Sequence, residues 1–82
     1  MRDLWTLHIA PEVARFLYTL PRGQATELRD ALAILRTNPK PEGAQPLVVE
    51  ELPDVYAVKL GRYRIEYQMI ERDRIIRILF VE

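Results

Sequence analysis

The chain has 82 residues, enough for one domain (residues 1–82) and too few for two. Its hydrophobic and charged fractions, 49% and 29%, are typical of globular proteins, and no apolar run approaches the ~18 residues that a membrane span needs. The absence of cysteine excludes disulfides and thiolate zinc sites, and zero net charge argues against tight binding to free RNA or DNA. The N-terminal residues 1–8 lack the apolar core of a secretion signal, so the cytoplasm is the expected location.

Alternation of apolar and polar residues predicts a first strand over Leu4–Ile9, half buried against the core. Pro11 follows at a favourable first helical position and starts an amphipathic helix. The apolar stripe of this helix has helical spacing and consists of Val13, Phe16, Leu17 and Leu20. The sequence Pro21-Arg22-Gly23 is expected to end it.

A second helix is expected from about Gln24 to Thr37, with an apolar stripe of Leu28, Ala31, Leu32 and Leu35. Asn38-Pro39 stops it, because a proline disfavours helical geometry at the residue before it. The two helices should form a hairpin whose apolar stripes face one sheet. Residues 39–54 hold four of the six prolines and are expected to form a loop, in which residues 47–49 either dock or make a short edge segment.

Three strands are predicted to complete the chain, at Val55–Leu60, Arg62–Ile70 and Arg74–Val81, joined by short turns at Gly61 and at residues 71–73. The predicted order is β-α-α-β-β-β. The fold class is therefore α+β, a small antiparallel sheet with a two-helix hairpin packed on one face. The last strand is apolar on both sides apart from two arginines, which favours a place near the centre of the sheet.

The middle strand of this group separates its side chains by alternation. The face expected to pack under the helices carries Tyr63, Ile65, Tyr67 and Met69. The opposite, polar face carries Arg62, Arg64, Glu66 and Gln68. If Gly61 and Arg62 form a two-residue turn, Leu60 opposes Tyr63 and Lys59 opposes Arg64, which places two cations side by side on the polar face.

Two facing cations repel each other unless an anion lies between them. Glu66, on the same face, could supply it within the protein, as part of a surface network of lysine, arginine and glutamate. The other interpretation is a site for a phosphate or for an acidic partner segment, which arginine binds well through its planar fork. The charge distribution places any anion site in the C-terminal part. Residues 55–82 carry six basic and four acidic residues, against six and eight in residues 1–54.

The chain lacks the residues that most other catalytic sites need. The only histidine, His8, has no second soft ligand, and the chain contains no serine, so neither a metal site, nor a cofactor, nor a Ser-His-Asp triad is expected. The cationic cluster could still promote RNA cleavage, which needs a base for the ribose 2′-hydroxyl, charge stabilisation at the phosphate and a proton for the leaving oxygen. A lysine can be that base only if its surroundings lower its pKa. The candidate acids are Tyr56, Tyr63 and Tyr67, of which Tyr63 and Tyr67 fall on the core face.

Two runs of the sequence resemble the RelE/ParE toxin superfamily. The run Asp30–Pro39 is similar to the second helix of that family and to its Asn-Pro stop, and the run Leu52–Gln68 is similar to its central hairpin. The resemblance extends over nearly the whole chain in element order and spacing. RelE-like members are toxins of bacterial type II toxin–antitoxin modules that cut mRNA in the ribosomal A site, whereas ParE-like members share the fold and poison DNA gyrase.

The resemblance implies a RelE-like, ribosome-dependent mRNA endonuclease that inhibits translation, with a cognate antitoxin, the ribosome and mRNA as partners. By position, Lys59 matches a catalytic lysine of these toxins, and Arg64 matches an arginine that contacts the scissile phosphate. Arg62 and Arg77 are the expected substrate-binding residues. Ala57 departs from the family, because the best-known RelE toxins carry a second lysine there.

The family also usually continues, beyond the position that Glu82 occupies here, into a short basic segment with another arginine and a tyrosine. Those residues and the second lysine normally complete the site. The alternative implied by the resemblance is therefore a non-enzymatic protein. It would be a ParE-like gyrase inhibitor or a degenerate toxin that acts by binding a protein partner.

Overall fold

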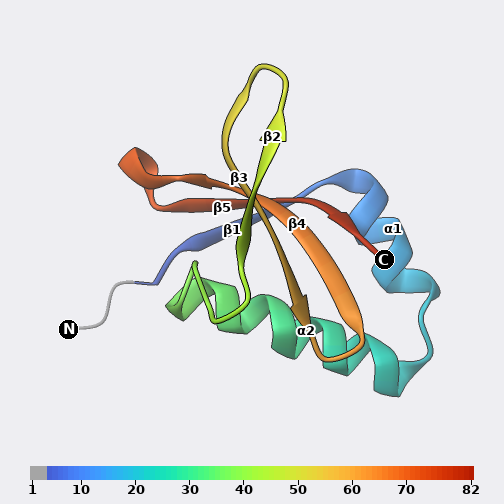
Figure 1. Ribbon diagram of the computed structural model, residues 1–82. Helices are drawn as coiled ribbons and strands as arrows, with labels where there is room; N and C mark the ends of the chain where they lie inside the picture. Colours follow the sequence, from blue (N-terminus) through green and yellow to red (C-terminus); the bar gives the residue numbers. More distant parts are fainter. Residues whose placement is uncertain (1–3) are drawn as a thin grey trace.

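Five strands form one sheet in the order β1-β5-β4-β3-β2 in the computed structural model, which describes residues 4–82 (Figure 1). The elements in chain order are β1 (Thr6–Ile9), α1 (Pro11–Thr19), α2 (Arg22–Thr37), β2 (Gln45–Val49), β3 (Leu52–Leu60), β4 (Tyr63–Ile70), the 3-10 turn η1 (Glu71–Asp73) and β5 (Ile75–Val81). The predicted α+β class is confirmed. Residues 1–3, part of the N-terminal segment expected to lack a secretion signal, lie outside the described residues.

The helices lie where their sequence signals place them. Pro11 is the first residue of α1, and α2 begins at Arg22, two residues before its predicted start, so that only two residues separate the helices. Asn38 ends α2 as predicted, and its backbone N–H donates a 2.9 Å hydrogen bond to the carbonyl of Ile34. The predicted apolar stripe of α2 is buried, namely Leu28, Ala31, Leu32 and Leu35. Neither helix in the described part of the chain is long and apolar enough to cross a membrane.

The sheet is mixed rather than wholly antiparallel, because β1 runs parallel to β5. Backbone N–H groups of Thr6 and Ala10 donate to the carbonyls of Arg74 and Ile78, which fixes the register of this pair. The alternation within a strand predicts its two faces but not the direction of its partner. The sequence pattern therefore placed β5 correctly inside the sheet, but the prediction of a wholly antiparallel sheet was wrong for the pair of β1 and β5.

The expected loop 39–54 contains a fifth strand, β2, antiparallel to β3 at the edge of the sheet. Pro46 is compatible with this position because an edge strand has one side on which no backbone N–H is needed. A register shift between Leu47 and Val49 bends the strand. The turn that follows includes Glu51 with a φ of 68°, and β3 begins three residues earlier than predicted, at Leu52. In Figure 1 this β2–β3 hairpin projects above the rest of the sheet.

The hairpin of β3 and β4 has the predicted register, with Lys59 opposite Arg64 and Leu60 opposite Tyr63. Gly61, with a φ of 62°, makes the turn between them. The predicted core face of β4 is confirmed, since Tyr63, Ile65 and Tyr67 are at most 4% exposed and Met69 is partly buried. The helices cover this face, where the ring of Phe16 meets that of Tyr63 edge-on at 6.4 Å between centroids.

Candidate functional site

The face of the sheet opposite the helices, here called the open face, carries side chains in rows that cross the strands. Directly opposite residues project to the same side, so the strand pairing defines each row. The Arg64 row consists of Lys59, Arg64 and Glu82. The Glu66 row consists of Gln45, Ala57, Glu66 and Phe80. The Gln68 row consists of Leu47, Val55, Gln68 and Arg77.

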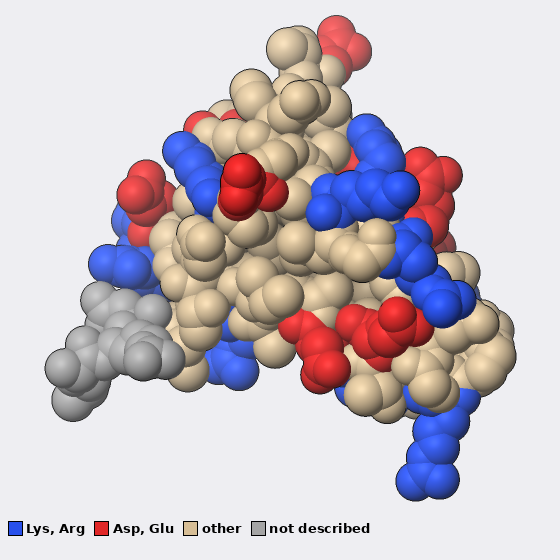
Figure 2. Space-filling view, turned by 60° about the horizontal axis from the view of Figure 1, so that its bottom comes forward, with Lys and Arg blue, Asp and Glu red and all other residues tan. Residues whose placement is uncertain are grey.

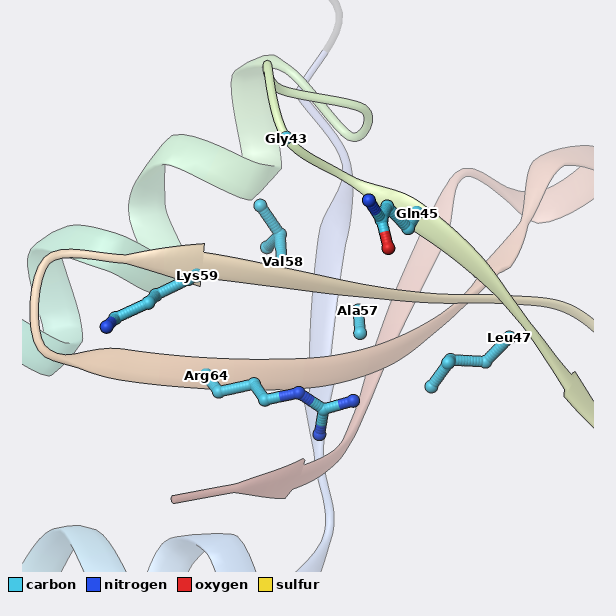
Figure 3. A pocket seen from close by; sticks show the side chains of 7 residues that line it. All are labelled: Gly43, Gln45, Leu47, Ala57, Val58, Lys59 and Arg64. Carbon is cyan, nitrogen blue, oxygen red and sulfur yellow. The ribbon is translucent and has the colours of Figure 1, made fainter.

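A hollow of about 260 Å³ lies where β2, β3 and β4 meet on this face (Figure 3). Its lining consists of Gly43, Gln45, Leu47, Ala57, Val58, Lys59 and Arg64. In Figure 3 the side chains of Gln45 and Leu47 reach down from β2 towards Ala57, while Arg64 closes the lower side. The short side chain of Ala57 leaves space in the middle of the hollow. The site is therefore a shallow pocket with one guanidinium on its wall.

Arg64 is held by two carboxylates. Its Nη1 lies 2.5 Å from Oε2 of Glu66 and 3.6 Å from Oε2 of Glu82, and its side chain is 41% exposed. Glu82 is also fixed by its backbone, because Arg64 and Glu82 exchange N–H···O bonds of 2.9 and 3.0 Å. The internal anion that the sequence suggested for this face is therefore present, and it neutralises Arg64 rather than bridging Arg64 to Lys59.

Lys59 lies opposite Arg64 in the register, but the two charged groups diverge. Figure 3 shows the Lys59 side chain extending towards the Gly61 end of the hairpin, whereas the guanidinium of Arg64 extends towards Ala57 and Leu47. Repulsion between like charges favours this separation, and the carboxylate of Glu66 favours the orientation of Arg64. Within residues 4–82, the Lys59 ammonium makes no ion pair.

The two expected substrate-binding arginines lie apart from this hollow. Arg62 lies in the hairpin turn, and its Nε is 3.2 Å from Oε1 of Glu27 on α2, so it turns towards the helical side instead of the polar face on which it was expected. Arg77 lies on the open face in the Gln68 row, where its Nη1 donates a 3.3 Å hydrogen bond to Oε1 of Gln68. Gln68 is buried, and its Nε2 donates to the carbonyl of Pro53 at 3.1 Å. The structure thus places Lys59 and Arg64 in the lining of one hollow with their charged groups apart, leaves Arg77 further along the same face and removes Arg62 from it.

The buried tyrosines are occupied inside the core. The hydroxyl of Tyr63 donates to the carbonyl of Gln24 at 3.1 Å, and that of Tyr67 donates to the carbonyl of Pro39 at 2.5 Å. Burial raises the pKa of Tyr67 to about 12. A hydrogen bond with Tyr56 raises the pKa of Lys40, whose Nζ lies 5.0 Å from the centre of the Tyr56 ring. These three tyrosines lie on the core side of the sheet, and neither they nor Lys40 line the hollow that contains Arg64.

Sequence reasoning missed three contributors to the site, namely Glu82, Gln45 and Leu47. Glu82 reaches Arg64 only through the pairing of β5 with β4, a contact between residues far apart in the chain. Gln45 and Leu47 line the hollow because β2 is a strand, and the surrounding prolines concealed that strand. The alternation of Gln45, Leu47 and Val49 around Pro46 was the available signal.

Charged side chains are interspersed on the surface. Figure 2, which brings the lower side of Figure 1 forward, shows small basic and acidic groups around an uncharged centre. A large, continuous basic surface is typical of proteins that bind free nucleic acid strongly. The described residues on this view do not form such a surface, in agreement with the zero net charge.

The structure is similar to solved toxin structures. It matches the archaeal RelE–RelB complex of Pyrococcus horikoshii with a TM-score of 0.75 and 27% identity, over 96% of this chain and 93% of the other. It matches a RelBE toxin–antitoxin complex of Mycobacterium tuberculosis with a TM-score of 0.78 and 24% identity, over 96% of both chains. The intact RelBE toxin–antitoxin complex of Escherichia coli gives a TM-score of 0.73 and 22% identity, over 94% and 93%. No protein-family model and no curated protein matches the sequence.

These structures share the whole architecture of the chain, since each comparison covers at least nine-tenths of both partners. The structural similarity includes both helices and the five-stranded mixed sheet, and it is not limited to a single hairpin. The resemblance seen in the sequence is thus matched in three dimensions.

Proposed function

We propose that this chain is the toxin of a type II toxin–antitoxin pair and cleaves mRNA on the ribosome, because its structure is similar to solved RelE toxins over nearly its whole length. Its place of action would then be the cytoplasm, where the ribosomes are. The observation that supports the activity best is the position of Arg64, the one guanidinium in the lining of the hollow on the open face. A guanidinium matches the oxygens of a phosphodiester and stabilises the extra charge that develops during cleavage.

The zero net charge of the chain is compatible with this proposal. A protein that cuts free RNA must bind the strand itself through many phosphate contacts. On the ribosome, the mRNA is already positioned, so a single arginine and a shallow hollow suffice for the local contact.

The proposal is tested with purified protein in a translation mixture that contains ribosomes and a defined mRNA. Primer extension should reveal cleavage within codons by the natural chain, and Arg64→Ala should remove it. Cleavage of the same mRNA without ribosomes would contradict ribosome dependence. The absence of cleavage together with inhibition of gyrase supercoiling would instead favour the ParE-like alternative.

A second hollow supports an antitoxin as partner. It has a volume of about 330 Å³ and lies between β1, α1 and α2. Its lining is mainly apolar and consists of Leu7, Ile9, Leu17, Leu32 and Ala33, together with Arg29 and Arg36. β1 is an edge strand, so this hollow opens at the side of the sheet. We infer that an antitoxin segment with apolar side chains and acidic neighbours docks there, since its carboxylates would pair with the two arginines.

A further inference from the structure

We propose that Glu66 is the general base of the cleavage reaction, a role that rests on the endonuclease function proposed above. A general base must lie within hydrogen-bond reach of the proton that it removes and must be deprotonated at the working pH. A glutamate side chain is ordinarily ionised at neutral pH, whereas a lysine side chain is ordinarily protonated. The residue that lies next to the phosphate-binding group and carries a carboxylate is Glu66.

The position of Glu66 fits this role. Its Oε2 lies 2.5 Å from Nη1 of Arg64, so a phosphate bound by the other nitrogens of that guanidinium would lie beside the carboxylate. The Glu66 side chain is 28% exposed, which keeps it accessible from the open face. Its neighbour on β3 is Ala57, whose methyl group leaves the approach from the hollow free.

The other candidates among residues 4–82 are less well placed. The ammonium of Lys59 points away from the guanidinium of Arg64 (Figure 3). His8 lies on β1 opposite Arg77, with β5 between it and the strand that carries Glu66. The hydroxyls of Tyr63 and Tyr67 donate hydrogen bonds into the core.

The reaction step is an internal transesterification. The carboxylate of Glu66 takes the proton of the ribose 2′-hydroxyl, and the 2′-oxygen forms a bond to the adjacent phosphorus. The bond between phosphorus and the 5′-oxygen of the next nucleotide breaks, and that oxygen takes a proton from water, which reaches the open face. Arg64 stabilises the negative charge on the non-bridging oxygens throughout. The products are a 2′,3′-cyclic phosphate and a free 5′-hydroxyl, with the proton left on Glu66 returned to water.

Glu66→Gln tests the proposal because it keeps the size and a hydrogen-bond acceptor but removes the basic group. On ribosomes programmed with mRNA, we expect this variant to cleave at least about 100-fold more slowly than the natural chain, the range typical of a lost general base. Glu50→Gln is the matched control, since it removes an exposed carboxylate in the turn between β2 and β3, at the far end of that hairpin from Arg64, and it should cleave at the natural rate. Binding to ribosomes carrying an mRNA with a 2′-deoxynucleotide at the cleavage site measures affinity without reaction. Glu66→Gln should bind this complex as tightly as the natural chain.

Two results would overturn the role of Glu66. If Glu66→Gln cleaves as fast as the natural chain or faster, the carboxylate only neutralises Arg64. If cleavage and binding of the 2′-deoxy complex fall together, Glu66 positions Arg64 and is not the base. A natural chain that cleaves no mRNA would overturn the proposed function itself, and the base with it, which is a different outcome from loss in the variant alone. Thermal melting of each variant establishes that it is folded.

Discussion

Arg64 and Glu66, two residues apart on β4, form an ion pair on the open face with Nη1 and Oε2 2.5 Å apart. Residues at this spacing in a strand lie on one face, so the pair follows directly from the alternation of the sequence. The pair turns the guanidinium away from Lys59, its neighbour across the hairpin. The site thus has one oriented guanidinium next to a carboxylate, and Lys59 stands apart from both.

Removal of this guanidinium should affect activity much more than stability. Arg64→Ala is expected to reduce ribosome-dependent cleavage by at least about 100-fold, because no other cation lies in its place to stabilise the phosphate. The free energy of unfolding should change by less than about 1 kcal/mol, since partly exposed ion pairs contribute little. Urea denaturation and the cleavage assay measure the two effects. Arg72→Ala, which removes an arginine with an 88% exposed side chain, should leave cleavage unchanged.

The turn that sets the Lys59–Arg64 register depends on Gly61. Its φ of 62° lies in the left-handed region, which costs about 1–2 kcal/mol for most other residues. A Cβ at this position would meet no atom within 4 Å, so the cost is one of backbone conformation alone. We expect Gly61→Val to lower the free energy of unfolding by about 2 kcal/mol and Gly61→Asn by less, because asparagine tolerates this region better. Denaturant melts measure both.

Gly23→Ala is the matched control for the turn. Gly23 lies in α2, and a Cβ there would also meet no atom within 4 Å. Alanine favours the helix and restricts the unfolded chain, so this variant should gain about 0.5 kcal/mol. Equal losses at both glycines would contradict the conformational explanation.

The buried hydroxyl of Tyr67 predicts a loss of stability in alkali. Its pKa of about 12 in the folded protein lies above the ordinary 10 of the unfolded chain, because burial disfavours the phenolate. The unfolded state therefore loses the proton first, and about 2–3 kcal/mol of stability that is fully present below pH 10 should be lost as the pH rises to about 12.

Comparison with Tyr67→Phe isolates this effect. At pH 7 the variant should be about 1 kcal/mol less stable, because the carbonyl of Pro39 loses its hydrogen bond. Between pH 10 and 12 the natural chain should fall towards the variant and then below it in urea melts. Tyr18→Phe, at an 83% exposed position, should leave the pH curve unchanged. A constant difference between the natural chain and Tyr67→Phe at all pH values would refute the prediction.

Local sequence patterns correctly predicted those parts of the fold that are formed by residues close together in the chain. Helical stripes, the Asn38-Pro39 stop and the alternation in β4 all arise within one element, and the register of Lys59 and Arg64 depends only on the turn between them. The parallel pairing of β1 with β5 and the contact of Glu82 with Arg64 join distant segments. Such contacts depend on the assembled sheet, so local patterns do not determine them.

The sequence pattern also could not predict the orientation of long side chains. Arg62 was expected on the polar face by alternation, but it lies in the turn, where alternation ends, and Glu27 on α2 attracts it. Arg77 was expected to bind substrate without being assigned to a face, and only the pairing of β5 with β4 shows that it lies on the open face beside Gln68.

The second hollow, the apolar groove between β1, α1 and α2, predicts a substitution that separates this chain from the antitoxin proposed as its partner. Ala33 is exposed and lines this groove between Arg29 and Arg36, so Ala33→Glu places a bulky anion where the partner's acidic and apolar side chains are expected. Calorimetric titration with the proposed antitoxin should give at least about 100-fold weaker binding, since burial of an unpaired charge in an interface is costly. Ile34→Glu is the matched control, because Ile34 is exposed on the same helix but lines a different hollow, with Arg62 and Tyr63. It should bind the antitoxin normally.

Because Ala33 is remote from the open face, Ala33→Glu should keep its cleavage activity and escape inhibition by the antitoxin. If both variants bind the antitoxin equally well, the partner docks elsewhere on the toxin.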